Sequence, residues 1–101
     1  MSKVSVVAKL TAQPGKRDDL VAALGGLLSA VEDEPGTLFY VANIDAKDAD
    51  VVWFFEVYES QEALQAHQGS EAMKAAGGAL GGLLAAMPEL YFGEPVGGKG
   101  I

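Results

Sequence analysis

The fold of this chain is set by residues 51–67, which read Val51-Val52-Trp53-Phe54-Phe55-Glu56-Val57-Tyr58-Glu59-Ser60-Gln61-Glu62-Ala63-Leu64-Gln65-Ala66-His67. The first half is rich in β-branched and aromatic residues, which predicts a strand that ends near Glu59. Ser60 is a favourable N-cap residue, so a short helix should follow and extend to about His67. The stretch contains the only Trp and the only His of the chain. We therefore expect any chemistry to centre here.

The flanking residues predict the remaining elements. Alternating apolar residues predict a strand over 3–11, and apolar residues spaced by four, three and four positions predict a helix over 16–32. A β-rich strand over 37–45 should form an antiparallel hairpin with 51–58. Ser70 caps a predicted helix over 71–87, and an edge strand over 90–96 follows Pro88.

This order of elements predicts an α+β fold of ferredoxin-like (βαββαβ) topology, with both helices on one face of a four-stranded antiparallel sheet. At 101 residues, the chain is expected to form a single domain over 1–97 with a flexible C-terminal tail over 98–101.

Composition excludes several classes of function. The chain has 7 Lys+Arg against 14 Asp+Glu and a net charge of −7, which argues against nucleic acid or an anionic membrane surface as a partner. With no Cys and one His, disulfides and thiolate chemistry are excluded and no metal site is expected. The N-terminus does not resemble a signal peptide, so a cytoplasmic protein is expected.

The predicted third strand is apolar on both faces. Its odd positions include Trp53 and Phe55, and its even positions include Phe54 and Tyr58. A sheet with one wet face should instead alternate apolar and polar residues. Since helices cover only one face, we expect the sheet of a second, identical chain to cover the other, giving a homodimer with an apolar cavity near the barrel axis.

Both long predicted helices contain the same pentapeptide: Leu24-Gly25-Gly26-Leu27-Leu28 recurs as Leu80-Gly81-Gly82-Leu83-Leu84. Composition biased toward Gly and Ala is the simpler explanation, and an internal duplication is the alternative. Glycines inside helices cost roughly 1 kcal/mol each relative to Ala. They would be explained if the helices lie close against the sheet or must flex.

Several motifs together resemble the antibiotic biosynthesis monooxygenase (ABM) family. They are the turn Glu34-Pro35-Gly36, the strand end Phe55-Glu56-Val57-Tyr58-Glu59-Ser60, and then Glu62-Ala63-Leu64, His67 and Ser70. The resemblance covers roughly residues 4–96. It implies a dimeric α/β barrel of ferredoxin-like protomers. Some members of the family oxygenate quinols or polyketide aromatics without metal, flavin or haem, and others degrade haem. The haem-degrading relatives place an iron-ligating His where this chain has Gly77, which does not favour that activity here.

One candidate site lies on the odd-numbered face of the predicted hairpin. Asn43 should lie opposite Trp53, and the cavity would be lined by Phe39, Val41, Asn43, Trp53 and Phe55. An aromatic pocket with one amide suits a planar phenolic substrate. In the cofactor-free relatives an Asn and a Trp are implicated in oxygen chemistry, so the resemblance implies that role for this pair. Aromatic packing at a dimer interface is the alternative.

A second candidate site lies on the opposite face. Glu56 would face the helices, where a carboxylate needs a partner, and His67 is the obvious one. Glu56 would then either orient His67 as a general base or simply lock helix to strand. Tyr40 and Tyr58 could anchor a hydroxylated ligand, or pack locally. The acidic cluster over 32–34 is most simply a solvated helix end.

The resemblance, taken with these residues, implies a cofactor-independent monooxygenase that acts on a quinol or related small aromatic substrate with molecular oxygen. The alternative is a non-catalytic small-molecule-binding or stress-related dimer built on the same barrel.

Overall fold

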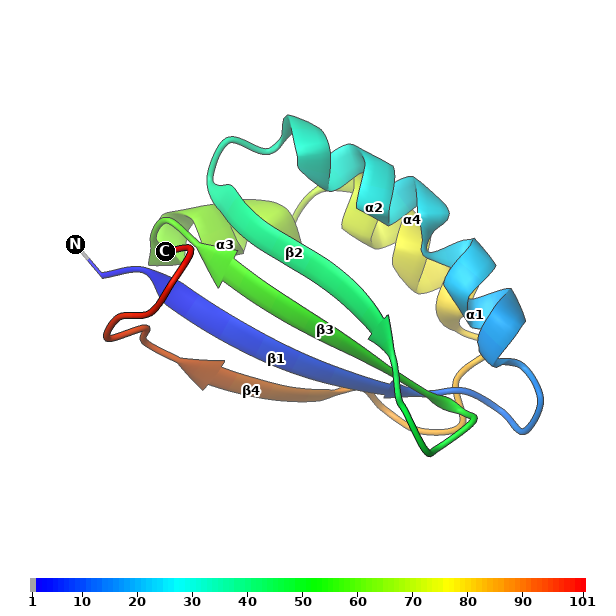
Figure 1. Ribbon diagram of the computed structural model, residues 1–101. Coiled ribbons are helices and arrows are strands. Elements are labelled where there is room, and N and C mark those ends of the chain that lie inside the picture. Colours follow the sequence, from blue (N-terminus) through cyan, green and yellow to red (C-terminus); the bar gives the residue numbers. More distant parts are fainter. Residues whose placement is uncertain (1) are drawn as a thin grey trace.

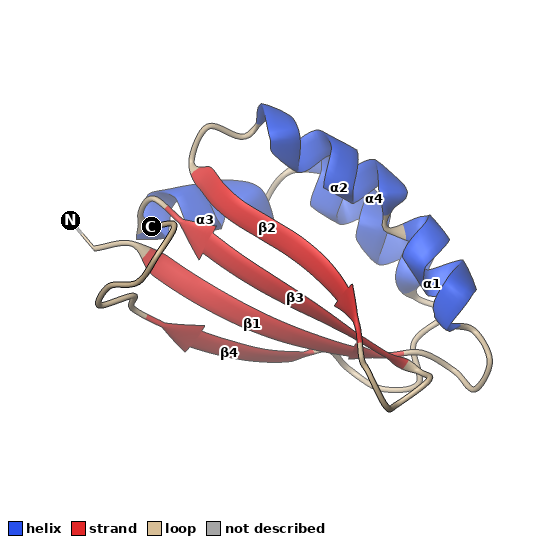
Figure 2. Ribbon diagram, in the orientation of Figure 1, coloured by secondary structure: helices blue, strands red, loops and turns tan. Residues whose placement is uncertain are grey.

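A computed structural model describes residues 2–101 and shows a sheet covered by helices on one face (Figure 1). The strands are β1 (Val4–Thr11), β2 (Thr37–Ile44), β3 (Val51–Tyr58) and β4 (Glu89–Gly93). They form a single antiparallel sheet in the order β2-β3-β1-β4 (Figure 2). The helices are α1 (Arg17–Ala23), α2 (Gly25–Ala30), the 3₁₀ turn η1 (Val31–Asp33), α3 (Gln61–Gln68) and α4 (Glu71–Leu80). The predicted ferredoxin-like α+β fold is therefore confirmed.

The core lies between the helices and the even-numbered face of the central strands. Val52 and Phe54 of β3 are buried there beside Leu20, Leu24 and Leu27 of the first helical region. Val6, Ala8 and Leu10, at even positions of β1, are buried on the same side, as their alternation predicted. Burial of apolar side chains on this one face holds the two layers together.

The helix predicted over 16–32 is nearly continuous but is divided at Leu24 between α1 and α2. The helix predicted to reach Met87 ends at Leu80, so that boundary was wrong. The segment after Leu80 instead joins the end of β1, where the Gln13 N–H donates to the Leu83 carbonyl at 2.8 Å and the Ala85 N–H donates to the Thr11 carbonyl at 2.8 Å. No helix within residues 2–101 is long and apolar enough to cross a membrane.

The odd-numbered face of the sheet is open. The strand register aligns Val41, Phe55, Val7 and Tyr91 in one row across all four strands. All four side chains are exposed, and Phe55, in a central strand, is 43% exposed. The division of β3 into one covered and one uncovered apolar face agrees with the prediction.

Candidate active site

Two buried polar side chains lie beneath the helices, near the junction of β3 and α3. Glu56 of β3 is 8% exposed and His67 of α3 is 3% exposed. Ser60 caps α3, since its Oγ accepts from the Ala63 N–H at 3.1 Å. Ser70 closes the corner to α4, because its Oγ donates to the His67 carbonyl at 2.8 Å. These caps fix the helix that carries the imidazole.

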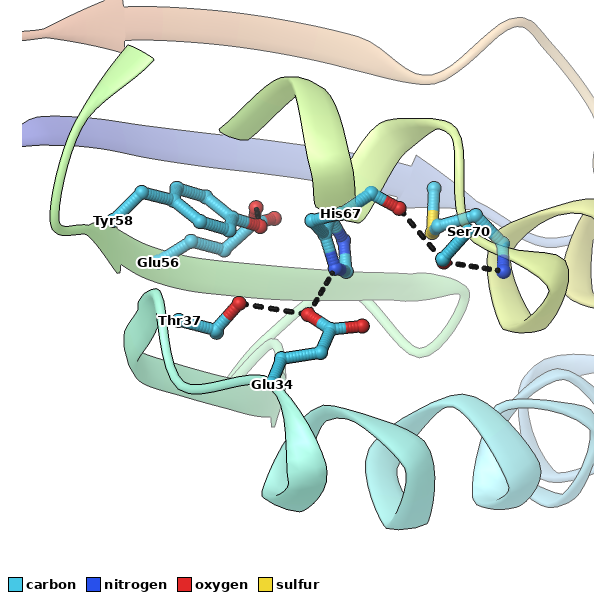
Figure 3. Close-up of polar contacts among 7 residues, drawn as sticks. Glu34, Thr37, Glu56, Tyr58, His67 and Ser70 are labelled. Carbon is cyan, nitrogen blue, oxygen red and sulfur yellow. Dashed lines mark hydrogen bonds and ion pairs between the residues drawn. The ribbon is translucent and has the colours of Figure 1, made fainter. Parts of the chain in front are cut away.

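His67 is paired with Glu34, not with Glu56. The Nδ1 atom of His67 lies 2.9 Å from Glu34 Oε1, and Thr37 Oγ1 donates to the same oxygen at 2.7 Å (Figure 3). The prediction that His67 is the partner of Glu56 was therefore wrong. The prediction of a solvated Glu34 was wrong as well, because its side chain is only 22% exposed. Spacing along the sequence did not indicate that the turn after η1 folds against α3.

Gly36 explains how that turn reaches the helix. A Cβ atom built at Gly36 would lie 2.6 Å from the Cβ atom of Ala63 on α3, which is far inside van der Waals contact. The Gly36 carbonyl also accepts the Glu59 N–H at 2.9 Å. The missing side chain thus allows the close approach that places Glu34 beside His67. The Glu34-Pro35-Gly36 motif was the sequence signal for both residues, but it indicated a turn and not a partner for His67.

Glu56 has a different partner. Tyr58 Oη donates to Glu56 Oε1 at 2.5 Å (Figure 3). Burial raises the pKa of Glu56, and this is opposed by the hydrogen bond from Tyr58 and by the nearby His67.

Two tyrosines pack around the imidazole. The ring centroid of His67 lies 5.1 Å from that of Tyr40 and 5.3 Å from that of Tyr58. Burial is the main cause that raises the pKa of both phenols, and the negative charge of Glu56 raises both further. Both hydroxyls therefore remain protonated at neutral pH and can donate hydrogen bonds.

A pocket of about 340 Å³ lies between the covered face of the sheet and helices α3 and α4. Its walls are mostly apolar, with Tyr40, Glu56 and His67 among the residues that line it. His67 Nε2 has no hydrogen-bond partner among residues 2–101. Every fully buried side-chain N or O atom in that range does have a partner. Nε2 is therefore not sealed inside the protein, and the pocket is the space that His67 lines.

The structure thus divides the predicted site residues between two faces. Tyr40, Glu56 and His67 border the pocket. Tyr58 does not line it but contacts Glu56 and His67, which do. The pocket is lined by none of the five residues predicted to line a cavity, Phe39, Val41, Asn43, Trp53 and Phe55. Those side chains belong to the uncovered side of the sheet, so the cavity predicted between the sheets of two chains stays a prediction.

Asn43 and Trp53 are opposite one another in the β2–β3 register, as predicted. Both side chains make hydrogen bonds within the hairpin. Asn43 Nδ2 donates to the Trp53 carbonyl at 3.3 Å, and Trp53 Nε1 donates to Asp45 Oδ1 at 2.8 Å. Hydrogen bonds from the Asp48 N–H, the Trp53 indole and the Lys47 N–H lower the pKa of Asp45 to about 2. These contacts stabilise the hairpin.

Within residues 2–101, no three His, Asp or Glu side chains form a group that could hold a metal ion. The candidate site contains five acid–base groups: the imidazole of His67, its carboxylate partner Glu34, a second buried carboxyl at Glu56, and the phenols of Tyr40 and Tyr58.

Comparison with known proteins places this fold and site in a family. The sequence model of the antibiotic biosynthesis monooxygenases matches residues 3–78, more than half of the 101 residues. No curated protein gives a significant match. A solved structure from Caulobacter crescentus, assigned to these monooxygenases, is 32% identical, with a TM-score of 0.90 over 95% of this chain and 92% of its own.

Two further structures agree. One from Chloroflexus aurantiacus, assigned to the same monooxygenases, is 36% identical, with a TM-score of 0.84 over 99% of each chain. Rv0793 from Mycobacterium tuberculosis is 28% identical, with a TM-score of 0.88 over 97% of this chain and 99% of its own. The protein belongs to the antibiotic biosynthesis monooxygenase family.

Proposed function

We propose that this protein is a monooxygenase that needs no bound cofactor and oxidises a quinol or related small aromatic substrate in the pocket beneath the helices. One observation carries the proposal: a buried imidazole, paired with a carboxylate through Nδ1, borders an apolar pocket of about 340 Å³. That volume lies within the range typical of small-molecule sites.

His67 is the proposed general base. A carboxylate at Nδ1 favours the tautomer with its proton on that nitrogen, which leaves the lone pair of Nε2 free to accept a proton. When Nε2 takes the proton, Glu34 stabilises the positive charge of the imidazolium. Thr37 in turn orients Glu34 through the hydrogen bond at 2.7 Å. His67 is the proposed catalytic residue, and Glu34 and Thr37 are positioning residues.

The substrate itself supplies the electrons. Loss of the phenolic proton to His67 gives an electron-rich anion, which reacts with molecular oxygen. One oxygen atom replaces a ring hydrogen and the other leaves as water, so that a hydroquinone and O₂ give a hydroxyquinone and H₂O. The apolar walls exclude bulk water from the anion, and the protonated phenol of Tyr40 can donate a hydrogen bond to it.

We also propose that a second copy of the chain covers the open face of the sheet. The exposed Phe39, Val41 and Phe55 support this, together with the exposed Tyr91 at the edge. Contiguous apolar surface of this kind typically marks an interface. Trp53 and Asn43 would then act at the dimer interface and in the hairpin, and not in oxygen chemistry.

Product analysis tests the activity. Naphthohydroquinone is mixed with the protein without oxygen, ¹⁸O₂ is then admitted, and hydroxynaphthoquinone carrying one ¹⁸O atom is measured. Autoxidation alone gives unlabelled naphthoquinone. We expect His67→Gln to lower the enzymatic rate by about 10²-fold or more, as for loss of a general base, whereas Trp53→Phe retains most of it.

No labelled product above the protein-free control, across a panel of quinols, would contradict the proposal. The apolar pocket of about 340 Å³ would equally serve the second candidate, a non-catalytic binding protein. Binding of the quinol without turnover would establish it.

A further inference from the structure

We propose that Gly77 and Gly81 of the α4 region form the entrance to the pocket, and that their missing side chains admit an aromatic ring between this helix and β4. The inference rests on the pocket assigned above as the active site. Both glycines line the pocket, and both are exposed. Four positions separate them, so they lie one above the other on the same face of the helix. Pro88, just before β4, and Leu90, within β4, also line the pocket.

The backbone does not require glycine at these two positions. Neither residue has a positive φ angle, and Gly81 has a helical conformation with φ −52° and ψ −40°. Glycine inside a helix is less favourable than Ala, so its use at position 77 needs a compensating reason.

Packing within the chain does not supply that reason. A Cβ atom built at Gly77 would meet no heavy atom within 4 Å outside the helix's own backbone, and one at Gly81 would meet only ordinary contacts at 3.8 Å and 4.0 Å. Close packing of the helices on the sheet was one of two expected explanations for the repeated glycines, and it does not hold for Gly81, which belongs to the repeat. Unlike Gly78, these two glycines line the pocket.

A second observation indicates a ligand in that space. His67 lines the same pocket, is 3% exposed, and has no partner for Nε2 among residues 2–101. A ring that lies against the bare backbone at Gly77 and Gly81 would occupy the same pocket as this imidazole. The pocket would then select by size, because a side chain at either glycine would project into the opening.

Neighbouring positions on α4 provide a matched test. Gly77 lines the pocket, whereas Gly78 is exposed, does not line it, and has open space where a Cβ atom would be. Binding of naphthol and of phenol is measured by calorimetry for the wild type, Gly77→Leu and Gly78→Leu. Thermal melting shows whether both variants fold, and we expect both to melt no lower than the wild type, since Leu is the better helix former.

We expect Gly78→Leu to bind naphthol as the wild type does, and Gly77→Leu to bind it about tenfold more weakly, because the new side chain competes with the ring. Phenol is smaller than naphthol, so its affinity should fall by a smaller factor in Gly77→Leu. Gly77→Ala should weaken naphthol binding in the same direction by a smaller factor.

Equal affinity of the wild type and Gly77→Leu for naphthol would overturn the inference, as would an equal loss in Gly78→Leu or an absence of binding to the wild type. The proposed activity is scored separately by turnover. Binding that depends on Gly77, without oxygenation of any quinol, would support the entrance and reject the monooxygenase.

Discussion

Replacement of Glu34 by Ala should destabilise the protein by about 2–3 kcal/mol. The carboxylate accepts hydrogen bonds from His67 Nδ1 at 2.9 Å and Thr37 Oγ1 at 2.7 Å. The Ala variant leaves Nδ1 of His67, whose side chain is 3% exposed, without its partner. A buried donor left unpaired costs about 1–3 kcal/mol, and the lost bond from Thr37 adds about 1 kcal/mol. Because Glu34 is partly exposed, the total loss of stability should stay below the sum of the two upper estimates.

Glu34→Gln should cost less, about 1 kcal/mol. The amide oxygen of Gln can accept from both donors, so this variant removes the charge and keeps the hydrogen bonds. The difference between charge-assisted and neutral hydrogen bonds is about 1 kcal/mol. For a domain of this size, each kcal/mol corresponds to about 4–8 °C in Tm.

Urea unfolding at pH 7, followed by circular dichroism, measures both changes. Glu32→Ala is the matched control, because it removes one negative charge only two residues away, in η1, and Glu32 is exposed. We expect the control to stay within about 0.5 kcal/mol of the wild type. If Glu34→Ala were no more destabilising than Glu32→Ala, the pairing with His67 would not stabilise the fold.

Three further changes test other parts of the structure. Gly36→Ala should destabilise the protein by about 1–3 kcal/mol in urea unfolding, because the new Cβ atom would collide with that of Ala63. Adding Ala63→Gly to this variant should restore part of the lost stability. If it restored none, the close approach would be refuted. Burial raises the pKa of Glu56 above its ordinary 4.5, so the folded state holds this proton more tightly than the unfolded state. As pH rises from below 4.5 toward 7, the wild type should therefore lose stability relative to Glu56→Gln. A flat or opposite trend in paired urea titrations would be inconsistent with this. Phe55→Lys should convert a dimer of the 10.5 kDa chain to a monomer, as measured by light scattering. Val21→Lys, at an exposed apolar position in α1, should leave the dimer intact. A wild-type protein that is itself monomeric would reject the proposed interface.

Much of the fold could be predicted because its signals are local. The two-residue period of side-chain direction along a strand correctly separated Phe54 from Phe55, and the hairpin connection correctly placed Asn43 opposite Trp53. These features depend on residues that are neighbours in the sequence or across one turn.

The partner of His67 could not be predicted in the same way. Glu34 lies 33 positions away, within a run of acidic residues that resembles any exposed helix end. The contact depends on the approach of Gly36 to Ala63, which no periodic pattern encodes. Tertiary packing, and not local sequence, selects Glu34 over Glu56.

The pocket beneath the helices was not predicted, for a related reason. Parity shows which side chains share a face, but it does not show where α3 and α4 leave space above that face. The apolar period of α4 also continues to Leu83 and Met87, whereas the chain after Leu80 forms backbone hydrogen bonds with the end of β1. Those bonds, formed at Gln13 and Thr11, end the helix before its apolar pattern ends.

The most direct test of the proposed site is a crystal structure of the protein with naphthohydroquinone, grown and frozen without oxygen. We expect the ring beneath the helices, between α4 and the covered face of the sheet, with one hydroxyl within hydrogen-bonding distance of His67 Nε2. A ring bound instead on the opposite face of the sheet, against Phe55 and Trp53, would contradict the assignment of the active site.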